Sequence, residues 1–347
     1  MLAVMPITPW HWTAFIVCVI IFLALDLGLF HRHAHTVKFR EAIIWSAVWF
    51  SLAMLFALGL RHLRGQKEAL EFTTGYLIEL SLSMDNVFVI ALVFAFFRVP
   101  SEYQHRVLYW GILGALIMRG AMIGIGVALI SMVDWILYVF GAFLLYSGIK
   151  MLFVEPEVEP EKSRVVRLAR KLYPITPALD GHKFVTTWQG KRALTPLALV
   201  LLMVETTDLL FAVDSVPAVF AVTRKPFIVF TSNVFAILGL RSLYFLLAGA
   251  MGYFRYLKYG LPLVLVFMGV EMLIDPHERK QPLWFQVDIP TSVSLMVVAG
   301  ILFISILLSI IAAQRDERRG KGNPKADGNP KSEAQTASGE ENQEDEA

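Results

Sequence analysis

Nine long apolar segments separated by short polar ones dominate the hydrophobic pattern of this chain. An α-helix needs about 20 apolar residues to cross the hydrocarbon core of a membrane. The segments cover approximately 9–29, 41–60, 70–97, 106–130, 133–153, 194–222, 227–250, 256–275 and 290–313. The pattern therefore predicts an all-α polytopic membrane protein with about nine transmembrane helices.

The composition agrees with this class. The chain is 56% hydrophobic and 17% charged, whereas soluble domains are about 45–50% apolar and about 25% charged. One cysteine, Cys18, excludes an internal disulfide and a cysteine-rich metal cage. No lysine or arginine precedes Arg32, so we expect the first apolar segment to be a retained span and not a cleaved signal peptide.

Lysines and arginines are concentrated in alternate connecting segments. These segments are 30–40, 98–105, 154–193, 251–258 and the C-terminal tail. Positively charged loops favour the cytoplasmic side, so we expect the N-terminus outside and the C-terminus in the cytoplasm. Because the basic residues flank spans, the net charge of +2 gives no indication of nucleic-acid binding.

We divide the chain into a transmembrane domain, 1–313, and a polar tail, 314–347, that we expect to be disordered. The cytoplasmic loop 154–193 contains a basic amphipathic stretch from Ser163 to Tyr173. This stretch is either a helix on the inner leaflet or a solvated loop helix.

Two short stretches place carboxylates inside apolar segments and resemble each other. Glu79, Asp85 and Asn86 lie in the first, and Asp208, Asp214 and Ser215 have the same spacing in the second. A carboxylate near the bilayer centre costs about 2.5–3.5 kcal/mol, so such residues are functional candidates.

The similarity extends to two three-span units, about 70–153 and about 194–275. Their second spans carry Arg119 and Arg241, and their third spans end in the related strings that begin at Gly148 and Gly269. Because three is odd, the second unit enters the membrane from the opposite side, which predicts an inverted repeat with a substrate site near the midplane. Chance similarity is the alternative, because only the acidic stretches match closely.

Helical geometry groups these side chains into faces. Residues seven apart share a face, so Glu79 aligns with Asn86, and Asp208 with Ser215 and with Glu205 one turn earlier. Asp85 and Asp214 fall about 120° from those faces in an unbroken helix. One site could collect them from a broad polar face or from an unwound helix. Pro217 favours a helix break in the sixth span, because proline leaves the carbonyl of Val213 without its helical partner.

The ligand types point to a hard cation. Carboxylate, amide and hydroxyl oxygens suit Mg, Ca and Mn. Five acids face only two intramembrane arginines, Arg119 and Arg241, and a divalent ion plus a proton would neutralise the excess charge. The candidate metal ligands are Glu79, Asp85, Asn86, Glu205, Asp208, Asp214 and Ser215. A purely structural reading is that the acids pair with the arginines and lock the bundle.

Three histidines, His31, His33 and His35, alternate after the first span. They form either a metal-collecting or pH-sensing patch, or an ordinary polar loop.

The chain resembles the TerC family of integral membrane proteins, and within it the Alx-like manganese exporters. Four strings carry the resemblance, which covers about residues 10–313: Tyr76–Val89, Asp134–Phe143, Glu205–Val222 and Thr231–Arg241. It implies Mn(II) efflux across the bacterial inner membrane, driven by inward proton movement. It also implies that Glu79, Asp85, Glu205, Asp208 and Asp214 carry transport.

The resemblance further implies a non-enzymatic protein without a permanent cofactor. Its partners are then Mn(II), other divalent cations, protons and the lipid bilayer. The family name comes from tellurium resistance, but an anionic tellurite substrate fits badly with five carboxylates.

Other functions remain open on the residues alone. A membrane scaffold or stress-resistance protein would use the acids only to hold the arginines. An intramembrane aspartyl protease needs two aspartates at one water, and no Gly-x-Gly-Asp string occurs. A cationic organic solute is a further candidate substrate. No phosphate-binding GxxxxGK[ST] loop occurs, which argues against ATP hydrolysis.

Overall fold

The computed structural model describes residues 7–30, 39–133, 135–153, 164–248, 257–275, 286–287 and 289–321. Within them, a helix lies at each of the nine predicted apolar ranges. These helices are α1 (Pro9–Phe30), α2 (Phe39–Arg64), α3 (Gln66–Phe96), α4 (Ser101–Met132), α5 (Ile136–Phe153), α7 (Pro196–Val222), α8 (Pro226–Ala248), α9 (Leu257–Ile274) and α10 (Thr291–Lys321).

In the described part of the chain, seven of these helices are long and apolar enough to cross a membrane: α2, α3, α4, α5, α7, α8 and α10. The apolar stretches described in α1 and α9 are shorter, Pro9–Leu25 and Tyr259–Ile274. The fold is therefore the predicted helical, multi-pass membrane type. The exact number of nine membrane crossings stays a prediction.

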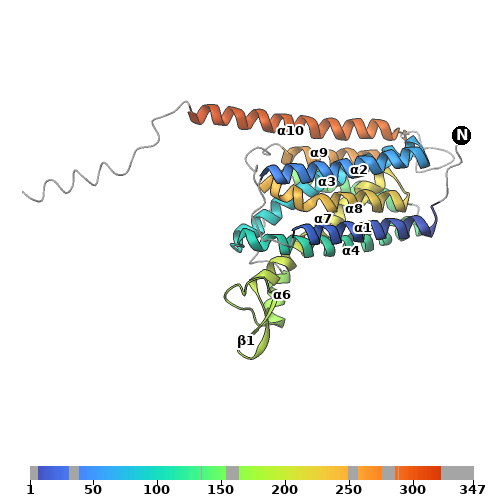
Figure 1. Ribbon diagram of the computed structural model, residues 1–347. Helices are drawn as coiled ribbons and strands as arrows, with labels where there is room; N and C mark the ends of the chain where they lie inside the picture. Colours follow the sequence, from blue (N-terminus) through green and yellow to red (C-terminus); the bar gives the residue numbers. More distant parts are fainter. Residues whose placement is uncertain are drawn as a thin grey trace, which may run out of the picture.

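The helices lie side by side in one bundle with roughly common axes (Figure 1). Its main contacts join α3 with α8, α4 with α7, and α5 with α9. The helices α3 and α8 are the most enclosed by neighbours, so polar groups on them are sheltered from both lipid and water. We call the two ends of the bundle after their turns, the α3–α4 end and the α7–α8 end.

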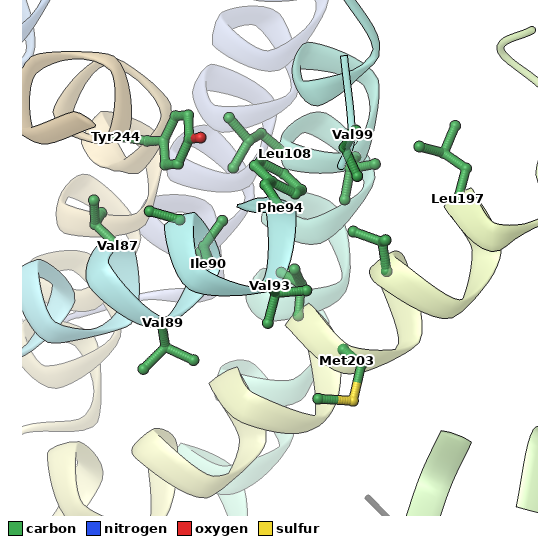
Figure 2. Close-up of a cluster of buried hydrophobic side chains, with 14 of the residues drawn as sticks. Val87, Val89, Ile90, Val93, Phe94, Val99, Leu108, Leu197, Met203 and Tyr244 are labelled. Carbon is green, nitrogen blue, oxygen red and sulfur yellow. The ribbon is translucent and has the colours of Figure 1, made fainter. Parts of the chain in front are cut away.

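Apolar side chains close the α3–α4 end. Val87, Ile90 and Phe94 of α3 pack into one cluster with Met203 of α7 and Tyr244 of α8 (Figure 2). Burying a side chain of this size is worth about 1.5–3 kcal/mol in water, and within lipid the same contacts act through close packing. This cluster separates the bundle interior from the polar turns at that end.

The pair α5 and α9 is joined by glycines that allow a close backbone approach. A Cβ at Gly269 would lie 2.6 Å from the backbone nitrogen of Leu145 and 2.9 Å from the carbonyl oxygen of Gly141. A Cβ at Gly148 would lie 2.9 Å from the carbonyl oxygen of Pro262. Small residues at a helix contact are the usual means of tight packing in membranes.

We therefore expect Gly269→Ala to destabilise the protein by about 1–3 kcal/mol, the typical effect of overpacking. The measurement is thermal unfolding of the purified protein in detergent. The matched control is Gly300→Ala on α10, where nothing lies within 4 Å of an added Cβ. Equal unfolding temperatures for the two variants would contradict the close α5–α9 contact.

A small unit between α5 and α7 stands beside the bundle (Figure 1). Its helix α6 (Arg164–Leu172) lies within the predicted amphipathic stretch and buries Val166 and Ala169. A hairpin of β1 (Val185–Trp188) and β2 (Lys191–Leu194) was not predicted. Gln189 (φ 51°) and Gly190 (φ 76°) both have positive φ and form the two-residue turn that suits a hairpin.

Two sequence predictions concern the ends of the described ranges. The predicted disorder from residue 314 is wrong for 314–321, because α10 continues to Lys321. Arginine, glutamate and glutamine there are good helix formers, so they extend the apolar helix. The histidines His31, His33 and His35 and the tail from residue 322 lie outside the described residues.

Candidate functional site

Six polar side chains meet inside the bundle and come from four helices. We call this group the Arg119 cluster; its members are Glu79 and Asn86 of α3, Arg119 of α4, Asp208 and Ser215 of α7, and Asn233 of α8. The group therefore joins the two three-helix units that the internal similarity of the sequence predicted.

Arg119 is the centre of the cluster and uses its whole guanidinium. Its Nη2 donates to Asp208 Oδ1 at 3.1 Å and its Nε to Asp208 Oδ2 at 3.4 Å. Its Nη1 donates to Ser215 Oγ at 3.1 Å and to Asn233 Oδ1 at 3.2 Å. It also forms an ion pair with Glu79. The guanidinium is thus the cation that the two carboxylates share.

Asn86 completes the contacts of Asp208. Its Nδ2 donates to Asp208 Oδ1 at 3.1 Å. Asp208 therefore accepts hydrogen bonds from both α3 and α4, and its position depends on helices of the first three-helix unit.

Burial makes these contacts energetically important. Glu79 and Ser215 are fully buried, and Arg119 is only 2% exposed. A buried charge is tolerated when it is paired, and removing one partner typically costs about 3–5 kcal/mol. The cluster is therefore a group in which no single charged member can be lost without a penalty.

Helical periodicity explains why four predicted residues meet. Glu79 and Asn86 are seven residues apart on α3, and Asp208 and Ser215 are seven apart on α7, so each pair shares one face. The helices α3 and α7 contact each other, α3 also contacts α8, and α7 also contacts α4. The two polar faces therefore turn toward Arg119.

The three other predicted acids lie outside the six-residue cluster. Asp214 accepts a hydrogen bond from Ser147 Oγ of α5 at 2.8 Å. The Glu205 carboxylate packs directly against Gly114 of α4, where an added Cβ would overlap it. Asp85 is partly exposed and lies about 100° around α3 from Asn86. Asp214 and Glu205 thus contact helices of the first unit at places outside the cluster.

The predicted helix break at Pro217 is wrong. The helix α7 runs without interruption from Pro196 to Val222 with Pro217 inside it. Proline removes one hydrogen bond, from the carbonyl of Val213, and its fixed φ is helical. Membrane helices tolerate this loss when neighbouring helices surround them. Asp214 consequently keeps its off-face direction, toward α5.

Arg241 does not join the Arg119 cluster. It lines a small cavity with Trp45 and Trp49 of α2 and His105 of α4. His105 is in the second turn of α4, so this cavity lies toward the α3–α4 end. We predicted a counter-ion or gating role for both arginines; the structure places them at different sites, and the roles stay predictions.

Beside the cluster is a cavity of about 10 Å³, lined by Asn86, Gly111, Thr207, Asp208 and other residues of α3, α4, α7 and α8. This is about the space of one water. A hydrated divalent ion would fit only after the helices or Arg119 move.

Among the described residues, no group of three or more His, Cys, Asp or Glu side chains is arranged to hold a metal ion. The cluster offers two carboxylates with an amide and a hydroxyl, and Arg119 occupies the space between the carboxylates. The donor atoms suit a hard cation, but the carboxylates and the Ser215 hydroxyl contact the guanidinium, and Asn86 contacts Asp208.

Asn233 is the cluster member that the motif analysis missed. It is 1% exposed and lies in a polar string, Thr231-Ser232-Asn233, inside the apolar α8. A polar string in a membrane helix is itself a signal of a functional interior face. This string could therefore have identified α8 as a fourth contributor.

Comparison with known proteins gives consistent matches over most of the chain. The family model described as "Integral membrane protein TerC family" matches residues 64–317. An uncharacterized membrane protein of Myxococcus xanthus is 52% identical over 309 residues, covering 88% of this chain and 94% of the relative. No solved structure matches the chain significantly.

Two further relatives extend the range of organisms. Alx of Escherichia coli K12, which is named as a candidate membrane-bound redox modulator, is 46% identical over 324 residues, covering 90% of this chain and 98% of the relative. An uncharacterized membrane protein of Rickettsia felis is 40% identical over 301 residues, covering 86% of this chain and 97% of the relative.

Proposed function

Because the chain belongs to the TerC family of integral membrane proteins, we propose that it is a secondary transporter that exports Mn(II) from the cytoplasm in exchange for protons. The observation that carries this proposal is the buried Arg119 cluster, in which Glu79 and Asp208 approach one cation from two helices. Charged groups buried in a membrane bundle typically mark an ion pathway. Their oxygen chemistry suits Mn(II).

In the proposed mechanism, the Arg119 guanidinium occupies the position of the transported cation as long as no ion is bound. An entering Mn(II) ion is attracted to Glu79 and Asp208 and displaces the guanidinium from between them. Asn86 Oδ1, which has no hydrogen-bond partner among the described residues, and Ser215 Oγ supply neutral oxygens within the same cluster. Protons that reach the carboxylates from the other side weaken metal binding, because protonated carboxylates are poor ligands.

The remaining predicted ligands suit a path leading to and from this cluster. Glu205 lies one helical turn before Asp208, and Asp214 lies beyond it on the way to the α7–α8 end. Asp85 lies beyond Glu79 on α3, on the way to the α3–α4 end. We propose that these acids pass the ion along rather than bind it all at once.

An inverted repeat would provide two alternating states, and the helix contacts support it. In such a repeat, α3 corresponds to α7, α4 to α8 and α5 to α9. The contact of α3 with α8 then corresponds to the contact of α7 with α4. By the same correspondence of α5 with α9, the close contact of Gly269 with Gly141 is equivalent to that of Gly148 with Pro262. Such symmetry is typical of secondary transporters with a midplane site.

For orientation, we propose that the α3–α4 end faces the cytoplasm and the α7–α8 end faces outward, in a bacterial inner membrane. The basic segment 164–193, with Arg167, Arg170 and Lys171 exposed on α6, then lies on the cytoplasmic side. This follows the usual excess of positive charge on that side.

The test is cellular manganese content after Mn(II) challenge, in cells that lack their own exporter. We expect the unaltered protein to lower manganese, and Asp208→Asn to leave it at the level of cells without the protein. Asp180→Asn, in the loop between α6 and β1, is the matched control and should export normally. Normal export by Asp208→Asn at equal membrane levels would overturn the proposed site.

A second candidate is a membrane scaffold or stress-resistance protein that transports no metal. The ion pairs of Arg119 with Glu79 and Asp208 favour it, because they would lock the three helices α3, α4 and α7 together without any substrate. In that case Asp208→Asn would lower the amount of assembled protein, and even the unaltered protein would not lower cellular manganese. A redox role, which the name of Alx suggests, would have to work without an internal cysteine pair, because Cys18 is the only cysteine of the chain.

A further inference from the structure

A second polar site lies at the α7–α8 end, away from the Arg119 cluster. A cavity of about 360 Å³ opens there between the ends of α3, α7, α9 and α10, and we call it the vestibule. One water occupies about 30 Å³ in the liquid, so the vestibule has room for a divalent ion with a shell of about six waters.

Most charged groups of the vestibule are paired with each other. Lys225 Nζ lies 3.1 Å from Glu71 Oε2 and 3.2 Å from Glu68 Oε1. Thr223 Oγ1 donates to Glu71 Oε2 at 2.9 Å. Arg224 Nη2 lies 3.7 Å from Asp275 Oδ2. These contacts tie the α7–α8 turn to α3 and α9. The Glu71 carboxylate therefore already has partners.

Glu271 is different from the other acids. Its side chain lines the vestibule but is 94% removed from solvent, being 6% exposed. Ser294 of α10 donates to its Oε1. Its Oε2 has no hydrogen-bond partner among the residues that the structure describes. A buried polar atom without a partner is costly, so this oxygen is a ready ligand for a cation.

Asp275 adds a second carboxylate on the same face. It follows Glu271 by four residues on α9, and side chains with this spacing are neighbours on a helix. It also lines the vestibule, as Ser294 does. Two carboxylates with a hydroxyl and bound waters are a typical oxygen set for a divalent ion that keeps part of its hydration shell.

The vestibule is separate from the Arg119 cluster. Its lining includes three buried apolar side chains, Leu137, Phe220 and Met272, which are 2–3% exposed. They belong to one apolar cluster that fills the space between α5, α7 and α9. Apolar constrictions of this kind block ions in channels and transporters, so an ion in the vestibule would be a distinct occupant.

We infer that Glu271, with Ser294 and Asp275, forms a second cation site that holds a hydrated divalent cation in the vestibule. The inference goes beyond the proposed function and depends on it only in the choice of Mn(II) as the probe. In the proposed orientation, this site would receive each ion as it leaves the protein.

The experiment is a Mn(II) titration of the purified full-length protein in detergent, with free hydrated Mn(II) measured by its six-line electron paramagnetic resonance spectrum. We expect the unaltered protein to show two Mn(II) sites. Glu271→Gln keeps the shape and the hydrogen bond from Ser294 but removes the charge, and should weaken one site at least about tenfold. Even outer partners of metal ligands typically change affinity about 10–100-fold.

Three comparisons decide the result. Glu71→Gln alters the neighbouring paired acid and should leave both sites intact, whereas an equal loss would show a general charge effect and overturn the site. Ser294→Ala keeps the carboxylate and should weaken the same site by a smaller factor, which covers the case that Glu271→Gln misfolds. Unchanged binding by both Glu271→Gln and Ser294→Ala would overturn the inference.

Failure of the proposed function gives a different pattern. Asp208→Asn should remove the other Mn(II) site and leave the vestibule site. If Asp208→Asn binds Mn(II) like the unaltered protein while Glu271→Gln loses a site, the vestibule inference stands and the proposed transport site fails.

Discussion

Replacing Arg119 by leucine is expected to destabilise the protein by about 3–5 kcal/mol. Glu79 and Asp208 both depend on the guanidinium for their positive partner, and both are buried. Two carboxylates facing each other without that partner repel each other and remain desolvated. The measurement is the unfolding temperature of the purified protein in detergent, together with its amount in the membrane.

A compensated variant separates stability from transport. Arg119→Leu combined with Glu79→Gln and Asp208→Asn removes all three charges and should recover most of the stability, because replacing a whole buried ionic group is often neutral. It should still fail to export Mn(II). If Arg119→Leu alone were as stable as the unaltered protein, the ion pairs could not have the energetic role given to them. Export by the compensated variant would contradict a carboxylate site.

The second large effect is expected at Gly114, where stability should be retained and export lost. An alanine Cβ at this position would overlap the Glu205 carboxylate, which lies at the end of a flexible side chain. Glu205 can therefore swing away at little structural cost, and alanine is a better helix former than glycine. The acid that precedes Asp208 would then point elsewhere. Export per molecule and unfolding temperature are the two measurements.

The matched control is Gly124→Ala on the same helix, because nothing lies within 4 Å of an added Cβ there. It should change neither export nor stability. Glu205→Gln should reproduce the export defect of Gly114→Ala. If Gly114→Ala exported normally while Glu205→Gln did not, the position of the Glu205 carboxylate would not matter to transport, only its presence.

Hydropathy was sufficient to predict where the helices lie, because each apolar segment must satisfy its own backbone hydrogen bonds inside lipid. Helical periodicity was sufficient to predict that Glu79 shares a face with Asn86, and Asp208 with Ser215. It also placed Asp214 off that face, and the structure directs Asp214 to Ser147 of α5.

The sequence could not predict which helices meet, because pairing depends on contacts between distant segments. The contacts of Asn233 with Arg119 and of Gly114 with Glu205 are therefore visible only in the structure. The error at Pro217 has another cause. A missing N–H group was taken to interrupt α7, but one lost hydrogen bond is small beside the packing of α7 against α3 and α4.

In the proposed exchange mechanism, the position of Arg119 bears on how ion leakage is avoided. A carrier that returns without cargo must cross the membrane with its binding carboxylates compensated, or it carries a costly net charge through the lipid. Here the guanidinium is paired with Glu79 and Asp208. It is covalently part of the protein, so it cannot be released on either side of the membrane. In the proposed exchanger, the unloaded site would keep this internal positive charge, which offsets one of the two carboxylate charges. Only a ligand strong enough to displace the guanidinium would then change the charge at the site.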